Sequence, residues 1–256
     1  MATFTVPGPK LQPSLRLSYD VMGEGPPVVL VHGFASNRNV NWRAPGWYHT
    51  LAEAGRKVIA LDVRGHGQSD KPHDAQAYDE GELAQDVVRL LDHLRIERAD
   101  VMGYSMGGFI TLRLLRDSPQ RVRRAVVAGV GENYYGHGGV ETEAIAAALR
   151  APDKDAIRGE VPLQFRLFAE QSDNDLEALA LCMTRPRRAI PASEFRSLNV
   201  PVLIVLGEKD MVTGPAGALA EALLGARVVM VPNRDHMTTV GDKVYKAAVL
   251  KFLDEP

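Results

Sequence analysis

The chain is poor in cysteine and has no long hydrophobic run. Its single cysteine, Cys182, excludes a disulfide within the chain and is typical of proteins from a reducing compartment. The longest apolar run, residues 200–206, is too short to cross a bilayer, and residues 1–10 have neither the basic segment nor the apolar core of a signal peptide. We therefore expect a cytoplasmic protein.

The chain also lacks an excess of charge of either sign, with 30 Lys and Arg against 32 Asp and Glu. A basic excess is what neutralises the phosphates of nucleic acids or the surface of an anionic membrane. We therefore expect a small-molecule partner rather than a nucleic acid or a membrane. Nothing in the sequence defines an oligomeric state.

What the chain does have is a regular alternation of short β-branched runs with longer helical patterns. This alternation is typical of βαβ units and predicts an α/β fold with a doubly wound, mostly parallel sheet. In such a sheet the functional loops gather at the carboxyl ends of the strands. The expected central strands are residues 27–31, 58–61, 99–102, 125–128, 202–206 and 228–231.

Two segments depart from this alternation. Residues 15–20 alternate between apolar and polar side chains, which predicts a half-exposed antiparallel edge strand. Residues 131–200 carry short apolar clusters between charged turns and no convincing buried strand. We therefore expect a core formed by residues 1–130 and 201–256, with residues 131–200 as a small helical insertion over the strand ends.

The most informative motif is Gly-Tyr-Ser-Met-Gly at residues 103–107, between an expected strand and an apolar-periodic helix. A serine between two glycines at this place is the pattern of a nucleophile elbow, in which the flanking positions must lack side chains so that strand and helix can pack. Ser105 then projects alone from the edge of the sheet. The alternative is an ordinary serine at the start of the helix, which caps it by accepting hydrogen bonds from backbone N–H groups.

A serine hydroxyl becomes a good nucleophile when a histidine takes its proton and a carboxylate orients that histidine. Asp210 follows the expected strand at 202–206, and His236 follows the one at 228–231. The chain order Ser, Asp, His is the order that this architecture uses. Rival positions for the acid are Glu208, Asp235 and Glu132.

Together with two further landmarks, at residues 31–35 and 62–70, these motifs resemble those of the α/β-hydrolase superfamily over nearly the whole chain. The resemblance implies a serine hydrolase of the esterase type. It also implies that the backbone N–H groups of Phe34 and Met106 form the oxyanion hole, and that the insertion is a cap. The loop at 64–70 is usually structural in such proteins.

The sequence differs from some members of that superfamily. Those that resemble haloalkane dehalogenases or epoxide hydrolases carry an aspartate where this chain has Ser105, which argues against both activities. Residues 32–35 are not the His-Gly-Gly-Gly run of many esterases and lipases, so the bulky-alcohol specificity of that group is not carried over.

Within the insertion, Phe165, Phe168 and Met183 are candidates for an apolar acyl pocket, although packing of the cap itself explains them equally well. The arginines of this segment are expected to form a solvated face rather than to select an acidic substrate. They are Arg158, Arg166, Arg185, Arg187, Arg188 and Arg196.

The predicted function is hydrolysis of a small carboxylic ester or related acyl compound through an acyl-enzyme on Ser105, without a cofactor. A metal site built from His32, His66, Asp62 and Asp70 lacks the spacing of a recognised site, so no metal is expected, and the two histidines are expected to brace their loops. The alternatives are a carbon–carbon bond hydrolase or enol-lactonase, a cofactor-free perhydrolase or haloperoxidase-like enzyme, and a small-molecule receptor that does not turn over.

Overall fold

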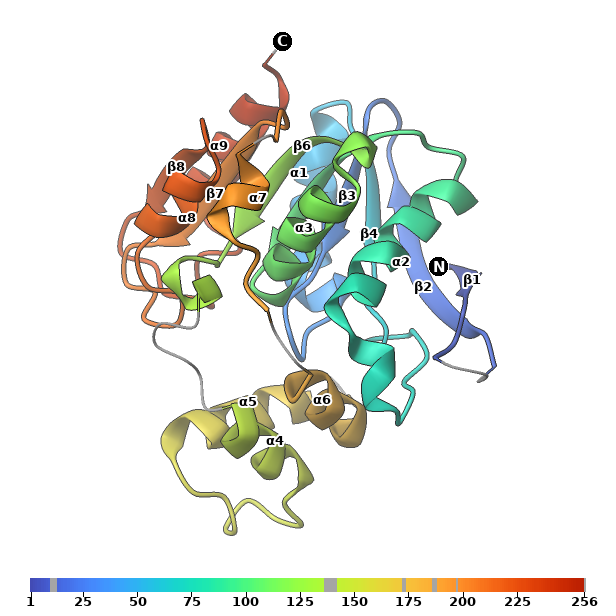
Figure 1. The fold of residues 1–256 in the computed structure, drawn as a ribbon, viewed down its shortest axis with the longest axis vertical. Helices are drawn as coiled ribbons and strands as arrows, with labels where there is room; N and C mark the ends of the chain where they lie inside the picture. The colour runs from blue at the N-terminus through green and yellow to red at the C-terminus, as the bar shows by residue number, and fades with distance from the viewer. Residues whose placement is uncertain (10–12, 136–141, 172–173, 186–187, 197, 256) are drawn as a thin grey trace.

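A computed structural model of the chain describes residues 1–9, 13–135, 142–171, 174–185, 188–196 and 198–255 (Figure 1). The strands of this part are β1 (Ala2–Val6), β2 (Leu15–Met22), β3 (Pro27–Val31), β4 (Lys57–Leu61), β5 (Ala99–Tyr104), β6 (Val122–Ala128), β7 (Val202–Gly207) and β8 (Arg227–Val231). The α-helices are α1 (Trp47–Glu53), α2 (Glu80–His93), α3 (Met106–Asp117), α4 (Thr142–Arg150), α5 (Glu160–Gln171), α6 (Leu176–Met183), α7 (Ala192–Phe195), α8 (Gly217–Ala222) and α9 (Lys243–Leu253).

The described strands form one eight-stranded sheet in the order β1-β2-β4-β3-β5-β6-β7-β8. The pairs β1–β2 and β2–β4 are antiparallel, and the pairs from β4 through β3 to β8 are parallel. This confirms the expected α/β class with a doubly wound, mostly parallel sheet. Because the parallel strands all run the same way, the loops that follow β3, β5, β7 and β8 emerge at one edge.

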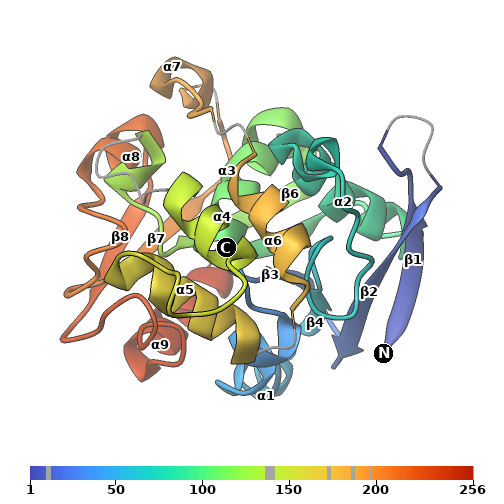
Figure 2. The same ribbon diagram turned by 90° about the horizontal axis from the view of Figure 1, so that it is seen from below.

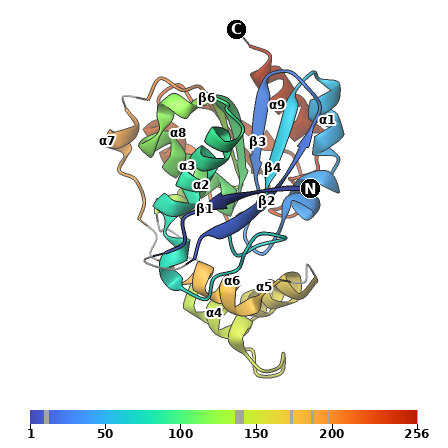
Figure 3. The same cartoon turned by 90° about the vertical axis from the view of Figure 1, so that its right-hand side faces the viewer.

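Helices cover both faces of the sheet, with α1 and α9 on one face and α2, α3 and α8 on the other (Figure 3). The sequence of β3 explains how one strand serves both layers, because successive side chains of a strand point to opposite faces. Val29 and Val31 join the cluster that includes α2 and α3, whereas Val28 and Leu30 join the cluster that includes α1 and α9. A continuous apolar run is therefore what a central strand requires.

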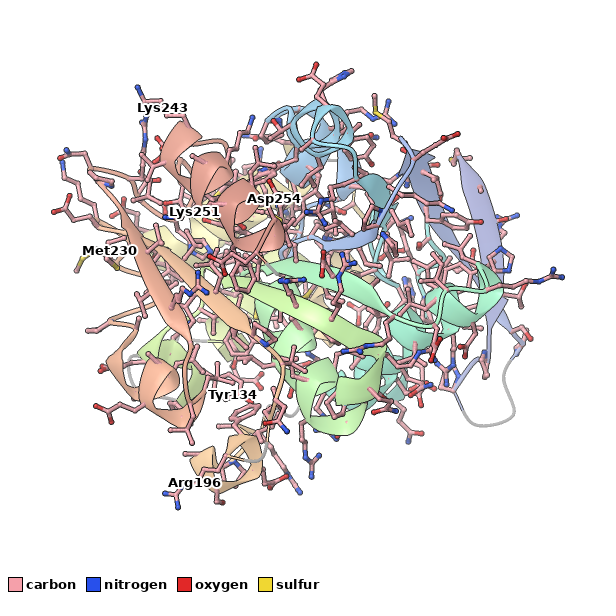
Figure 4. The ribbon with its side chains drawn as sticks, turned by 90° about the horizontal axis from the view of Figure 1, so that it is seen from above. Tyr134, Arg196, Met230, Lys243, Lys251 and Asp254 are labelled. Atoms are coloured by element: carbon pink, nitrogen blue, oxygen red, sulfur yellow. The ribbon has the colours of Figure 1, made fainter. Side chains whose placement is uncertain are left out.

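Two expectations about the sheet edges are wrong. The predicted edge strand at residues 15–20 lies inside the sheet, because β1 pairs with its outer side. At the other end, β8 is the edge strand instead of a central one, and its Val228 and Met230 are 41% and 46% exposed. Figure 4 shows Met230 on this outer strand. Both errors have one cause, since a strand's neighbours are set by partners far along the chain.

Helices α4, α5 and α6 form a separate layer beyond the edge at which the parallel strands end (Figures 1 and 2). Their apolar faces pack on one another through Ile145, Leu149, Leu179 and other side chains, and Ala35 of the loop after β3 joins this cluster. Helix α7 does not belong to this layer, because its Phe195 is buried in the core cluster that includes α2 and α3. The stretch between β6 and β7 therefore contributes both to this separate layer and to the core.

None of the helices in the described ranges is both long enough and apolar enough to span a membrane.

Candidate active site

Ser105 forms the turn between β5 and α3 with φ 52° and ψ −115°. A positive φ is strained for a residue with a side chain, and such strain persists only where the surrounding structure imposes it. The two flanking glycines show how it is imposed. A Cβ on Gly103 would lie 2.0 Å from the carbonyl oxygen of Gly107, and a Cβ on Gly107 would lie 2.0 Å from that of Val31. The turn therefore accepts only glycine at both positions.

The loops after β7 and β8 bring an acid and a histidine to this serine. His236 Nε2 lies 3.0 Å from Ser105 Oγ, and His236 Nδ1 lies 2.8 Å from Asp210 Oδ2. The other carboxylate oxygen of Asp210 accepts hydrogen bonds from the N–H groups of Val212 and Thr213, at 3.0 and 3.3 Å. Asp210 is buried, so the carboxylate is held in one orientation behind the imidazole.

Two of the rival acids, Asp235 and Glu208, are engaged elsewhere in the described structure. The carboxylate of Asp235 accepts hydrogen bonds from the hydroxyl and N–H of Thr238 and from the N–H of Met237, and these hydrogen bonds lower its pKa. Glu208 accepts from the N–H of Asn233. The carboxylate that is hydrogen-bonded to His236 is that of Asp210.

Tyr104, the residue before the serine, supports the histidine from behind. Its hydroxyl donates to the carbonyl oxygen of His236 at 2.5 Å, and the two ring centroids are 5.5 Å apart. Burial, and then the nearby charge of Asp210, raises the pKa of Tyr104, so this phenol stays a donor. Tyr104 was not recognised from the sequence, although the alternation along β5 could have found it. Neighbouring side chains of a strand point to opposite faces, and Tyr104 faces α9, where its ring lies beside that of Tyr245.

The backbone after β3 lies beside the serine. A Cβ on Gly33 would lie 3.4 Å from Ser105 Cβ, and the N–H of Gly33 donates to Asn41 Oδ1 at 3.0 Å. Phe34 follows in this loop, while the N–H of Met106 is at the first position of α3, where no acceptor exists within the helix. Phe34 and Met106 thus belong to segments that both adjoin Ser105. Asn41, whose buried Nδ2 has no partner in the described residues, was not recognised from the sequence.

A cavity of about 570 Å³ opens over Ser105 and His236. Its lining is mainly apolar and comes from both the sheet loops and the layer of α4–α6. The candidate residues Phe34, Met106, Phe165, Phe168 and Met183 all line it, whereas Asp210 lies behind His236. Further lining residues that the sequence analysis did not select are Asn41, Phe109, Tyr134, Tyr135, Arg185 and Met237.

The arginines of residues 131–200 do not form one solvated face. Arg158, Arg188 and Arg196 are exposed, as expected. Arg166 and Arg185 are buried, which corrects the expectation for these two. Arg166 of α5 is buried against the end of α4, where its Nη1 donates to the carbonyl oxygens of Ala148 and Ala151, and Arg185 is buried beside Cys182 of α6. Neither contact can be read from the charge pattern. Arg187 lies outside the described residues.

His32 and His66 are buried in the loops around the site, and each ring is hydrogen-bonded to backbone groups of these loops. His32 is buried and its Nε2 accepts a hydrogen bond from the N–H of Val63, and burial lowers its pKa, which keeps the ring neutral. The carboxylate of Asp62 accepts from the side chain and N–H of Arg38 and from the N–H of Gln68. These hydrogen bonds connect the loop after β3 to the loop after β4. Across the described ranges, no three histidine, cysteine or acidic side chains gather as they would around a metal ion.

Comparison with known proteins gives two family matches. A model described as "alpha/beta hydrolase fold" matches residues 26–150, and one described as "TAP-like protein" matches residues 169–256. Among curated proteins, the "dihydrolipoyllysine-residue acetyltransferase component of acetoin cleaving system" of Pseudomonas putida is 33% identical over 246 residues, which are 86% of this chain and 61% of that protein. The chain thus spans less than two thirds of the length of this relative.

Other relatives match over most of their length. A 2-hydroxymuconate semialdehyde hydrolase of Pseudomonas putida is 28% identical over 77% of this chain and 75% of its own. A solved hydrolase from Pseudomonas aeruginosa is 25% identical with a TM-score of 0.76, covering 99% of this chain and 98% of that one. A solved N-acyl homoserine lactone degrading enzyme is 27% identical with a TM-score of 0.70, covering 93% and 96%.

Proposed function

Because the chain belongs to the α/β-hydrolase superfamily, we propose that it is a serine hydrolase that cleaves small carboxylic esters or related acyl compounds. The observation that carries the proposal is the hydrogen-bonded chain from Ser105 through His236 to Asp210. Ser105 and His236 line a largely apolar cavity of a size suited to a small molecule.

In the proposed reaction, Ser105 Oγ attacks the ester carbonyl while His236 Nε2 takes its proton. The carbonyl oxygen becomes an oxyanion, which the N–H groups of Phe34 and Met106 stabilise; a donor of this kind is worth about 2.7–4 kcal/mol. His236 then returns the proton to the departing alcohol, leaving an acyl group on Ser105. A water molecule, deprotonated by His236, hydrolyses this acyl-enzyme and restores the serine.

Asp210 does not take the proton in this scheme. Its carboxylate holds Nδ1 of His236 in the protonated form, so that Nε2 faces Ser105 as the acceptor, and it stabilises the imidazolium that forms. Every step uses amino-acid side chains and backbone N–H groups, so the proposed reaction needs no cofactor and no metal.

We further propose that residues 131–200 act as a cap that selects the substrate. Phe165, Phe168 and Met183 supply apolar walls of the cavity from α5 and α6, whereas the reacting groups come from loops of the sheet. Selection and reaction are thereby assigned to different parts of the chain. We also propose a cytoplasmic location, on the basis of the single buried Cys182.

A second candidate is carbon–carbon bond hydrolysis. The supporting observation is the similarity to a 2-hydroxymuconate semialdehyde hydrolase, which extends over three quarters of each chain. The same serine, histidine and aspartate can serve such a reaction, so geometry at these three residues does not separate the two candidates.

Two measurements test the proposal. A fluorophosphonate probe should label Ser105 of the folded protein, as mass spectrometry of the digested adduct would reveal, and Ser105→Ala should not be labelled. The purified protein should also be assayed with phenyl esters of increasing acyl length, lactones and a vinylogous 1,5-diketone. Labelling at another residue, or no labelling at all, would contradict the mechanism; turnover of the diketone alone would favour the second candidate.

A further inference from the structure

Arg185 lies two residues beyond the end of α6 and lines the same cavity as Ser105. Only 4% of the residue is exposed. Its Nη1 contacts the carbonyl oxygen and the sulfur of Cys182, whereas its buried Nε has no hydrogen-bond partner in the described residues. A guanidinium group removed from water is stable when an opposite charge and acceptors for its N–H groups are present. Arg185 has acceptors at Cys182 for one of its nitrogens, but no opposite charge in the described residues.

The other buried arginines of the described residues differ from Arg185, because each has an opposite charge beside it. Each forms an ion pair with a carboxylate: Arg38 with Asp20 and Asp62, Arg56 with Asp254, Arg64 with Asp86, and Arg166 with Glu170. No such pair is found for Arg185 in the described residues. His66 cannot supply a negative charge either, because an imidazole ring is neutral or positive; burial, the nearby His32 and the charge of Arg185 itself lower the pKa of His66 and keep the ring neutral.

The position of Arg185 relative to the order of the strands indicates which part of a substrate it would meet. Its neighbour His66 belongs to the loop after β4, while His236 belongs to the loop after β8. Ser105 follows β5, which lies between these two strands. In Figure 2, α6 accordingly lies over the side of the sheet where β3 and β4 are, away from β8. Since the leaving group must be near His236 to be protonated, Arg185 faces the acyl portion.

We propose that Arg185 binds a carboxylate carried by the acyl portion of the substrate, so that the preferred substrates are hemiesters of dicarboxylic acids. The inference rests on the proposed serine hydrolase function and narrows its substrate class. Phe165, Phe168 and Met183 surround the methylene chain, and Arg185 pairs with the terminal charge in a region of low dielectric, where a charge-assisted hydrogen bond is strong.

A pair of esters with six-carbon acyl groups isolates this contact. Monophenyl adipate ends in a carboxylate, and phenyl hexanoate ends in a methyl group at the same place. The wild-type protein should have the higher kcat/KM for monophenyl adipate, and methyl phenyl adipate, which is neutral, should be treated like phenyl hexanoate. Arg185→Met should lower the ratio of kcat/KM values, adipate over hexanoate, by about 10- to 100-fold. Arg185→Lys should retain part of the preference.

The matched control is Arg188→Met, since Arg188 is exposed and lines a different pocket with Asp79, Glu80 and Arg113. It should leave the ratio unchanged. If Arg185→Met does not fold, inhibition of the wild-type protein decides: adipamate should inhibit hydrolysis of phenyl hexanoate more strongly than hexanamide does. Equal inhibition would overturn the inference.

Failure of this inference and failure of the proposed function look different. Hydrolysis of phenyl hexanoate with Ser105 labelled, but with a ratio that Arg185→Met does not change, would overturn only the carboxylate site. A fall of both esters by the same factor would assign Arg185 a purely structural role and would also overturn it. Absence of Ser105 labelling together with no turnover of either ester would overturn the proposed function itself.

Discussion

The hydroxyl of Tyr104 donates a hydrogen bond to the backbone carbonyl of His236 across 131 intervening residues, with 2.5 Å between the two oxygens. This contact ties the strand that ends at the nucleophile directly to the loop that carries the histidine. The distance between Ser105 Oγ and His236 Nε2 therefore depends on the residue that precedes the serine.

Tyr104→Phe should lower kcat by about three- to tenfold with little change in KM, because the loop of His236 loses one anchor and a carbonyl oxygen loses its donor. Steady-state kinetics on a phenyl ester would measure this. Tyr245→Phe is the matched control: its buried hydroxyl has no partner in the described residues, so its loss should not reduce kcat. Equal effects of the two variants would show that Tyr104 does not position the histidine.

Asp210→Asn should lower kcat by about 10⁴-fold, because an amide in place of the carboxylate stabilises the wrong tautomer of His236. The comparison is with Asp235→Asn, whose carboxylate faces Thr238 and the backbone of its own loop. That variant should retain most of its activity. An active Asp210→Asn enzyme beside a crippled Asp235→Asn or Glu132→Gln enzyme would transfer the role of the acid.

Phe168→Ala and Met183→Ala should alter the preference for acyl chain length, with changes of about 10- to 200-fold in relative kcat/KM when a wall of the cavity is lost. Fluorophosphonate labelling of Ser105 should persist, since neither side chain takes part in the reaction. Leu167→Ala, at the exposed neighbour on α5, should leave the preference unchanged. A preference that is the same in all three variants, with stability intact, would remove these side chains from the substrate site.

Gly107→Ala should destabilise the protein by more than about 4 kcal/mol, because the added Cβ would meet the carbonyl oxygen of Val31 at 2.0 Å and that strand cannot move aside. Gly217→Ala is the contrasting change. A Cβ there has no neighbour within 4 Å, and alanine in α8 should be neutral or stabilise by up to about 1 kcal/mol. Denaturant unfolding of both variants measures the difference; similar stabilities would contradict the packing described at the serine turn.

Local patterns were sufficient to predict the fold class and the turn at Ser105, because both depend on neighbours in sequence. The glycines at 103 and 107 indicate a close approach, and apolar runs such as that of β3 indicate strands covered on both faces. Edge position is different, since it depends on which strand pairs next. For this reason the edge was wrongly placed at residues 15–20 instead of at β1, and β8 was wrongly expected to be central.

The side chains of the site divide in the same way. Asp210 and His236 could be selected because each follows a strand in the order that the architecture uses. Arg185 and Asn41 could not, because their burial depends on how the layer of α4–α6 and the loop after β3 pack in three dimensions. The sequence around a polar or charged side chain does not show whether that side chain faces water or a cavity.

The position of β8 at the rim of the sheet has a consequence for inactivation. This strand pairs with β7 alone in the described sheet, and its outward side chains are partly exposed, so its backbone can fray at a lower free energy than the sheet as a whole unfolds. His236 is carried by the loop that follows it, while Ser105 is fixed between a central strand and a buried helix. Mild heat or denaturant would thus move His236 away from Ser105 while the turn at Ser105 stays folded. Activity would return on cooling or on dilution of the denaturant, as β8 pairs with β7 again.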